Sequence, residues 1–324
     1  MRDKELEVYE VNLAVSNICN ASCIYCPRSF VTHKDKFMSP DLVEKIMSEV
    51  GGWKFKSRHP VVHSSMAENG EPFLNPDIID LLKIVRGTVG HPGNKLSVAI
   101  FSNCSLLNED LSEKIIGNHL IDSLNVNIDG FSHESYYAVK GLNLENTEEN
   151  VKSFIRIRDK HGSPIRVLIH VISHYTYTEA VKKAYGINPI KGNGHYFPQD
   201  GHMVVEKWKK IINPSLDGIG EGGVLFWAER YNNKPISVEH GCPNIGRVRH
   251  VAYINPSGDW YACCFDMGND LVVGNINESS LLDISMSEKR RNLISMLDDG
   301  KLKEIGFPCT RVDSCSSMGK EMIS

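Results

Sequence analysis

The residues of this sequence best suited to chemistry are its nine cysteines. They form one group near the start of the chain and another near its end, with none between Cys104 and Cys242. Their number is odd, and residues 1–10 are charged and lack the apolar stretch of a secretory signal. Because disulfides belong to oxidising compartments, we expect a cytoplasmic protein whose cysteines bind metal or react.

The first group has the spacing C-x3-C-x2-C, formed by Cys19, Cys23 and Cys26. Three thiolates from one short loop can bind three irons of a [4Fe-4S] cluster, which normally takes four cysteines. The missing ligand leaves one iron open to a small chelating molecule, as a catalytic zinc keeps an open position. A zinc or structural site with a distant fourth ligand, such as His33, is the alternative.

The second group, Cys242, Cys263, Cys309 and Cys315, has enough thiolates to close a [4Fe-4S] cluster. A zinc ribbon is the alternative. The spacing G-x4-C from Gly258 predicts a hairpin whose second strand delivers Cys263. We expect the side chain of the adjoining Cys264 to face the opposite way, because side chains alternate along a strand.

Composition limits the partners. The net charge is -4, with 36 basic and 40 acidic residues well mixed, so we expect no nucleic-acid or anionic-membrane partner. No apolar run approaches the roughly 20 residues that span a bilayer. An ordinary apolar content of 41% predicts a globular protein with a substantial core.

Short apolar segments alternate with helical ones along the first two thirds of the chain. Strands are expected at 8–15, 61–66, 96–102, 123–128, 165–172 and 223–228, and helices at 41–50, 77–85, 111–116, 147–160 and 203–212. Six such repeats predict an α/β fold with parallel strands, a partial (β/α)6 TIM-like barrel. The active groups of such folds follow the carboxyl ends of the strands.

The pattern changes near residue 236. Strands are expected at 251–255, 260–264 and 271–276, and one helix at 282–297. We therefore predict a barrel domain over 1–235 and a small α+β domain with a β-hairpin over 236–324. The loop 185–202, rich in Gly, Pro, Asn and His, is expected on the substrate side of the barrel.

The cysteine loop after the first strand resembles the radical S-adenosylmethionine (radical SAM) superfamily, with Tyr25 at its aromatic position. Other motifs match in order: Asn69-Gly70-Glu71-Pro72 resembles Gly-Gly-Glu-Pro, Ser102-Asn103-Cys104 resembles Thr-Asn-Gly, and Asn127-Ile128-Asp129-Gly130 resembles Ser-Leu-Asp-Gly. The segment 254–276 resembles the hairpin of the auxiliary-cluster domains called twitch and SPASM. With so few cysteines left, one auxiliary cluster in a twitch/SPASM-like domain is the better match.

The resemblance implies three cofactors: SAM, a SAM-binding [4Fe-4S] cluster and a second, auxiliary [4Fe-4S] cluster. Cys19, Cys23 and Cys26 would bind the first cluster, and Cys242, Cys263, Cys309 and Cys315 the second. The SAM contacts would be Tyr25, Asn69, Gly70, Glu71, Pro72, Ser102, Asn103, Asn127 and Asp129.

Four further residues are candidates for roles near the substrate. Glu229 and Arg230 follow the sixth predicted strand and are candidate substrate contacts. Cys264 is either a buried small residue or a hydrogen-atom donor to a substrate radical. Cys104 replaces a family glycine close to the SAM site and is either structural or a donor.

The implied activity is reductive cleavage of SAM, followed by abstraction of a hydrogen atom from a small polar substrate such as a sugar or aminocyclitol. The outcome would be oxidation, epimerisation or rearrangement, with electrons from a flavodoxin or ferredoxin-type donor. A peptide-modifying maturase, of ribosomal peptides or sulfatases, is the alternative, although a chain that begins almost at its first strand leaves no room for a leader-binding domain. A non-catalytic iron–sulfur or zinc protein is the third reading, and the retained Gly70-Glu71-Pro72 argues against it.

Overall fold

Strands and helices alternate along the barrel part of the chain, in a computed structural model that describes residues 8–26, 28, 36–52, 61–64, 70–88, 97–173, 200–221, 242, 244–266, 268–306 and 308–309. The strands are β1 (Glu10–Leu13), β2 (Val61–Ser64), β3 (Ser97–Ser102), β4 (Ser123–Asn127), β5 (Arg166–Val171) and β6 (Gly218–Glu221). The helices are α1 (Pro40–Gly52), α2 (Ile78–Thr88), α3 (Glu109–Gly117), α4 (His133–Lys140), α5 (Leu144–Lys160) and α7 (Asp200–Trp208), with a short η2 (Pro72–Leu74).

The hairpin at the end of the chain continues the barrel sheet. The strand order is β6-β5-β4-β3-β2-β1-β7-β8-β9, and β1 to β6 pair in parallel. Strand β7 (Val251–Ile254) is parallel to the free edge of β1, and β8 (Asp259–Tyr261) and β9 (Val272–Asn275) follow antiparallel. The division of the chain at residue 236 stays a prediction, but the sheet itself is continuous across it.

Three elements differ from those predicted. The sixth strand precedes the predicted range, which lies outside the described residues, and its two glycines weaken the sequence signal for a strand. Helix α4 was missed, although Ser132 caps it with a capping box. The helix expected at 282–297 is two helices, α10 (Leu281–Ser285) and α11 (Glu288–Asp298), because an extended Ser287 caps the second one.

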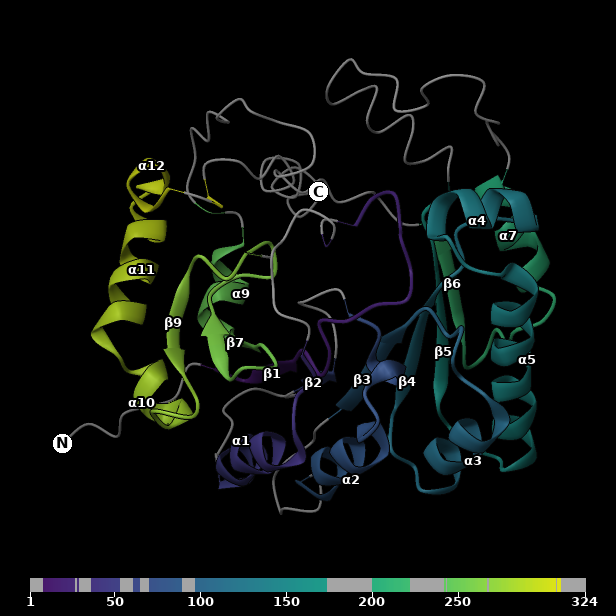
Figure 1. Ribbon diagram of the computed structural model, residues 1–324, viewed down its shortest axis with the longest axis horizontal. Coiled ribbons are helices and arrows are strands. Elements are labelled where there is room, and N and C mark those ends of the chain that lie inside the picture. The colour runs from purple at the N-terminus through teal and green to yellow at the C-terminus, as the bar shows by residue number, and fades with distance from the viewer. Residues whose placement is uncertain are drawn as a thin grey trace.

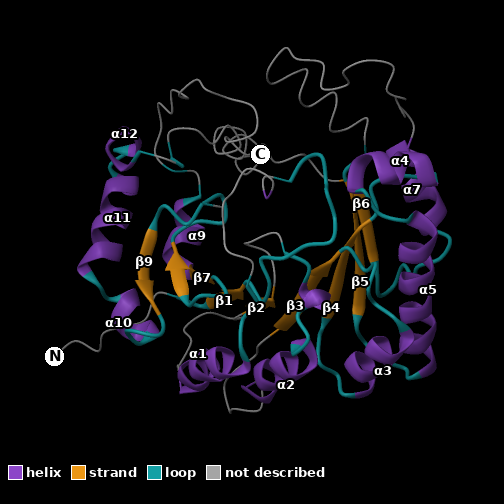
Figure 2. Cartoon of the chain, viewed as in Figure 1, coloured by secondary structure: helices purple, strands orange, loops and turns teal. Residues whose placement is uncertain are grey.

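The two faces of the sheet differ in chemistry. Alternate residues of β3, β4 and β5, such as Val98, Val126 and Ile169, are fully buried in the core beneath the helices. Helices α1, α2, α3 and α5 follow this outer side of the curved sheet (Figures 1 and 2). The register of the strands places the polar Asn125 and His170 on the other face, where Phe101 stacks against His170.

The carboxyl-terminal helices complete the described part of the fold. Helix α9 (Ile245–His250) leads directly into β7, and α12 (Leu302–Ile305) follows α11. Figure 1 places these helices beside the hairpin, at the opposite end of the sheet from β6. None of the helices in the described residues has both the length and the apolar character that crossing a membrane requires.

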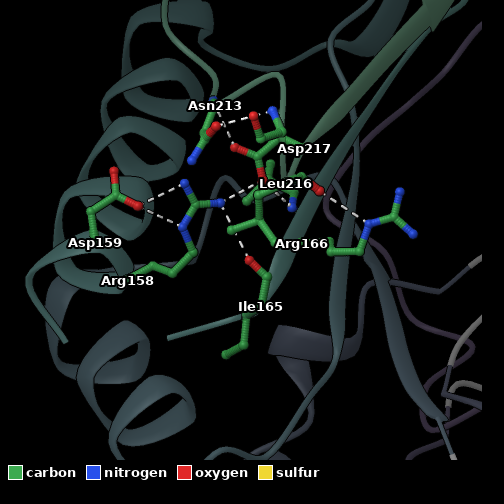
Figure 3. Close-up of polar contacts among 9 residues, drawn as sticks. Arg158, Asp159, Ile165, Arg166, Asn213, Leu216 and Asp217 are labelled. Carbon is green, nitrogen blue, oxygen red and sulfur yellow. Dashed lines mark hydrogen bonds and ion pairs between the residues drawn. The ribbon is translucent and has the colours of Figure 1, made fainter. Parts of the chain in front are cut away.

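A buried ion pair ties α5 to the amino end of β6, far from the carboxyl ends of the strands (Figure 3). The guanidinium of Arg158 donates to Asp217 over 2.5 Å, and both side chains are fully buried. Asp217 also accepts the backbone N–H of Val167 in β5 over 2.8 Å, and Arg158 donates to the carbonyl of Ile165. The pair therefore fastens a helix and two strands at the base of the barrel.

Replacing Arg158 by Gln is expected to destabilise the protein by about 3–5 kcal/mol, because Asp217 would keep an uncompensated buried charge. Chemical denaturation measures this change. The matched control is Arg156→Gln, on the same helix, whose pair with Glu149 is exposed at 59% and 63%. Its unfolding midpoint should stay with that of the parent, and equal losses in the two variants would contradict the role of burial.

Candidate functional site

The three amino-terminal cysteines lie in the loop that follows β1. All three are half-buried, and the N–H of Cys26 donates to the carbonyl of Cys23 over 3.1 Å. Burial, together with negative charge on Cys23 and Cys19, raises the pKa of the Cys26 thiol to about 11. The three sulfur atoms are therefore close enough to interact electrostatically.

The donor set suits an iron–sulfur cluster better than a single ion. Among the described residues, no three His, Cys, Asp or Glu side chains are grouped so that they could hold one metal ion. A cubane distributes its cysteine ligands over different irons, so its thiolates do not need to meet at one point. Three soft sulfur donors in one partly shielded loop fit such a cluster.

The Gly-Glu-Pro motif packs directly against the cysteine loop. The backbone N–H of Glu71 donates to the carbonyl of Ile18 over 2.7 Å. A Cβ atom on Gly70 would lie 1.9 Å from the carbonyl oxygen of Ser16, so only glycine fits this approach of two backbones. Pro72 begins η2, and Asn69, the first predicted residue of the motif, lies outside the described residues.

The Glu71 carboxylate connects this motif to the end of β3. It accepts hydrogen bonds from the hydroxyl of Ser102 over 2.7 Å, from the N–H of Asn103 over 2.8 Å and from the N–H of Phe73 over 3.1 Å. Burial raises the pKa of Glu71 to about 7, although these hydrogen bonds oppose the shift. The side chain thus acts as a bracket between the Gly-Glu-Pro segment and the end of β3, and contact with SAM from this residue would come through its backbone.

The next motif reaches the cysteines themselves. The amide nitrogen of Asn103 donates to Asn20 over 2.9 Å and lies 4.0 Å from the sulfur of Cys19. Cys104 is fully buried and has a φ of 58°, the left-handed conformation that favours glycine. Its thiol lies 3.8 Å from the carbonyl of Ser102, which supports a structural role.

The motif after β4 holds the cysteine loop from the other side. Asp129 is fully buried and accepts from the hydroxyl of Tyr25 over 2.5 Å and from the N–H of Ile172 over 2.7 Å. The ammonium of Lys140 lies 2.9 Å from the same carboxylate. Asn127 is half-buried at the end of β4. Lys140 is not among the predicted site residues, because nothing in the sequence marks a lysine of helix α4 as buried.

The second group of cysteines gathers beside β7 and β8. Cys242 precedes α9, Cys263 follows β8, and Cys309 follows α12. Burial raises the pKa of Cys309 to about 12, and negative charge on Cys242 adds to the shift, so these two thiols lie near each other. Cys315 lies outside the described residues, as do Glu229, Arg230 and most of the loop 185–202.

The expected direction of Cys264 is wrong. Strand β8 ends at Tyr261, so Cys263 and Cys264 lie in a turn and no longer alternate. The amide of Asn244 reaches both sulfurs, at 3.2 and 3.7 Å.

The surroundings of Cys264 favour its thiolate. A hydrogen bond from Cys263 lowers the pKa of Cys264 to about 6; burial opposes the shift, while the Arg247 charge and the Tyr253 hydroxyl add to it. The role of Cys264 as a hydrogen-atom donor stays a prediction.

Comparison with protein families matches both halves of this arrangement. Residues 13–183 match the radical SAM superfamily, and residues 242–316 match SPASM, an iron–sulfur cluster-binding domain. The first match includes the loop with three cysteines, and the second includes Cys242, Cys263, Cys309 and Cys315. The predicted resemblance is confirmed, and with it SAM and iron–sulfur clusters as cofactors.

Two curated relatives match the barrel part. A probable GTP 3',8-cyclase of Methanothermobacter marburgensis is 30% identical over 129 residues, which are 39% of this chain and 37% of the relative. GTP 3',8-cyclase of Mannheimia succiniciproducens is 26% identical over 141 residues, 42% of this chain and 38% of the relative. The matched segment spans well under half the length of these relatives.

Three solved structures share the fold over most of this chain. They are BtrN in complex with AdoMet and 2-DOIA (TM-score 0.54, 15% identity, 93% of this chain and 91% of that chain), anSMEcpe with bound AdoMet (0.60, 13%, 96% and 91%) and Streptococcus suis SuiB bound to precursor peptide SuiA (0.56, 15%, 96% and 76%). These similarities confirm the predicted α/β fold.

Substituting Gly70 by Ala is expected to push the cysteine loop away from the Gly-Glu-Pro motif, because the new methyl group would collide with the Ser16 carbonyl. Such overpacking costs roughly 1–3 kcal/mol, and iron content should fall with it. Anaerobic reconstitution and iron analysis measure the effect. The control Gly87→Ala, in α2 with nothing near its Cβ, should keep full iron content, and equal iron in both variants would contradict the close approach.

The raised pKa of Glu71 predicts a pH dependence of stability. Since the folded protein holds this proton more tightly than the unfolded chain, the stabilisation is complete below pH 4.5 and is lost as pH rises through about 7. The full effect is on the order of 3 kcal/mol. Urea unfolding at several pH values should show this loss in the parent and not in Glu71→Gln. Parallel curves for the two proteins would contradict it.

Proposed function

The chain belongs to the radical SAM superfamily, and we propose that it uses Cys19, Cys23 and Cys26 to hold a [4Fe-4S] cluster at which SAM is cleaved reductively. The cluster, when bound, supplies an electron to SAM, which then provides the species that abstracts a hydrogen atom from the substrate. The observation that carries this proposal is the contact of the Gly70-Glu71 backbone with the loop of three half-buried thiols.

The chain's own contribution is to hold the loop still and to orient SAM. The Glu71 carboxylate and the Asn103 amide fix the Gly-Glu-Pro segment and the end of β3 beside Cys19. The backbone of Gly70 and Glu71 would receive the amino group of SAM, and Tyr25, Ser102 and Asn127 would lie along the rest of the molecule. Because both oxygens of Asp129 already accept hydrogen bonds from protein groups, we assign it to the support of the loop.

We propose a small polar substrate, because the inner face of the sheet carries polar side chains. His170 and Asn125 hydrogen-bond over 3.2 Å. Asn12 in β1 is fully buried, and its neighbours in the strand, Val11 and Leu13, belong to the core. Within the described residues, neither its amide nitrogen nor its amide oxygen has a hydrogen-bond partner. Such an unpaired amide is costly unless a ligand pairs with it. Sugar or aminocyclitol hydroxyls suit these groups, and oxidation, epimerisation or rearrangement are the proposed outcomes.

The fold similarities support two kinds of substrate. BtrN, whose structure holds AdoMet and 2-DOIA, aligns over 91% of its length, whereas SuiB, bound to a precursor peptide, aligns over 76%. A peptide substrate is therefore the second candidate. We favour the small molecule because the polar groups described above lie on the inner face of the barrel sheet.

The carboxyl-terminal cysteines would hold the auxiliary cluster. We propose Cys242, Cys263, Cys309 and Cys315 as its four ligands, and the match of residues 242–316 to an iron–sulfur cluster-binding domain supports this set. We propose that the barrel domain covers 1–235 and the auxiliary domain 236–324. We also propose a flavodoxin or ferredoxin-type electron donor and a cytoplasmic location. The clustering of the cysteines and their odd total number support that location.

Iron analysis tests the proposal directly. We expect about eight irons per chain in the anaerobically reconstituted parent, since each of two cubanes holds four. The triple variant Cys19→Ala/Cys23→Ala/Cys26→Ala should hold about four and should form no 5'-deoxyadenosine from SAM and dithionite.

Two outcomes of that measurement change the proposal in different ways. About four irons in the parent and none in the triple variant, with zinc at the second group, would make the carboxyl-terminal domain structural. A parent that holds no iron, or that leaves SAM intact, would overturn the radical chemistry itself.

A further inference from the structure

Lys140 places a buried positive charge beside the cysteine loop. Its side chain is 5% exposed, and Lys140 is the last residue of helix α4. The cysteine motif does not itself require this helix. Taking an ammonium group out of water is costly unless an opposite charge and hydrogen bonds compensate it. A lysine in this position therefore needs a reason beyond packing.

Asp129 compensates part of this charge. The Lys140 ammonium lies 2.9 Å from its fully buried carboxylate, and Tyr25 donates to the same oxygen from within the cysteine loop. The ammonium also lies 5.6 Å from the centre of the Tyr25 ring, within range of a cation–π contact. Burial alone would lower the pKa of Lys140, but the Asp129 carboxylate, with Cys23 and Tyr25, raises it well above its ordinary value. The lysine is therefore charged at neutral pH.

The end of α4 also binds the loop through its backbone. The N–H of Ser22 donates to the carbonyl of Lys140, and the N–H of Ile24 donates to the carbonyl of Val139, both over 2.9 Å. Gly141 follows with a φ of 68°, and a Cβ atom there would lie 2.1 Å from the hydroxyl of Ser22. These contacts fix the ammonium group relative to the sulfurs of the loop.

The contacts of Lys140 lie at residues that adjoin the cysteines. The carbonyl of Lys140 accepts the N–H of Ser22, the residue before Cys23, and the ring that the ammonium faces belongs to Tyr25, the residue before Cys26. The fixed positive charge therefore lies at the cysteine loop itself.

We propose that Lys140 is a positioning residue that sets the reduction potential of the SAM-binding cluster. Reduction adds one negative charge to a group that already carries thiolate ligands, and a fixed cation nearby stabilises that added charge. The cation therefore makes the cluster easier to reduce. This inference rests on the proposed function, since it requires a cluster at Cys19, Cys23 and Cys26.

Redox titration followed by electron paramagnetic resonance tests the proposal on the full-length, reconstituted protein. The signal that changes when SAM is added identifies the relevant cluster and separates it from the auxiliary one. In Lys140→Gln, we expect the ratio of reduced to oxidised cluster at a fixed potential to fall about tenfold. This ratio corresponds to a potential more negative by ~59 mV for a one-electron couple. Lys140→Arg, which keeps the charge, should stay near the parent.

A second variant and a control separate charge from folding. Asp129→Asn removes the carboxylate charge and should move the potential in the opposite direction, to a less negative value. Arg158→Gln breaks another fully buried ion pair at the far end of the barrel, and it should lower stability without moving the potential. If Lys140→Gln binds no cluster, Lys140→Arg and Asp129→Asn still decide the matter.

The titrations separate a failure of the proposed function from a failure of the role of Lys140. A parent without a SAM-sensitive signal means that the proposed function has failed. A parent with the signal, but with potentials unchanged in Lys140→Gln and Asp129→Asn, overturns the role of Lys140. A shift of the same sign in Asp129→Asn and Lys140→Gln also overturns it, because loss of structure rather than of charge would then move the potential.

Discussion

Three half-buried thiols in one loop impose the constraint on which the rest of the site depends. As thiolates they repel one another, and over residues 17–26 the loop has no helix or strand of its own to resist that repulsion. The barrel supplies the resistance through the ends of its other strands. The segment that begins at Gly70 approaches backbone to backbone, the end of β3 contributes Asn103, and the segment after β4 contributes Asp129. Each of these three contacts stabilises the conformation of the loop by a different interaction.

The continuous sheet places the second group of cysteines at the other edge of the same strand. Strand β1 pairs with β2 on one side and with β7 on the other, and the cysteine loop leaves from its end. Arg247 reaches across this seam, donating to Tyr253 of β7 and to Glu10 of β1. The two cysteine groups therefore depend on one strand for their relative position, which a flexible link between domains would not provide.

The sequence predicted the cysteines that do the chemistry better than the residues that hold their loop in place. Cysteine spacing and the alternation of strands and helices are local signals, and the family and the α/β fold predicted from them are confirmed. The support is non-local: Glu71 as a bracket to β3 and Lys140 as a buried cation depend on contacts between residues far apart in sequence. The direction of Cys264 was wrong because strand alternation was extended beyond the last residue of β8. Where a strand ends is decided by pairing, which a single sequence does not show.

The contacts that hold the end of β3 beside the cysteine loop include a strained backbone conformation at Cys104. A family glycine would adopt its φ of 58° freely, whereas a residue with a side chain loses roughly 1–2 kcal/mol there. The surroundings oppose that loss: the hydroxyl of Ser102 accepts the N–H of Cys104, and the amide of Asn150 in α5 donates to its carbonyl over 2.9 Å. Because Ser102 also donates to Glu71, the strained turn and the bracket form one connected set of hydrogen bonds. The strain at Cys104 is thus held by the same groups that keep the end of β3 beside the cysteine loop.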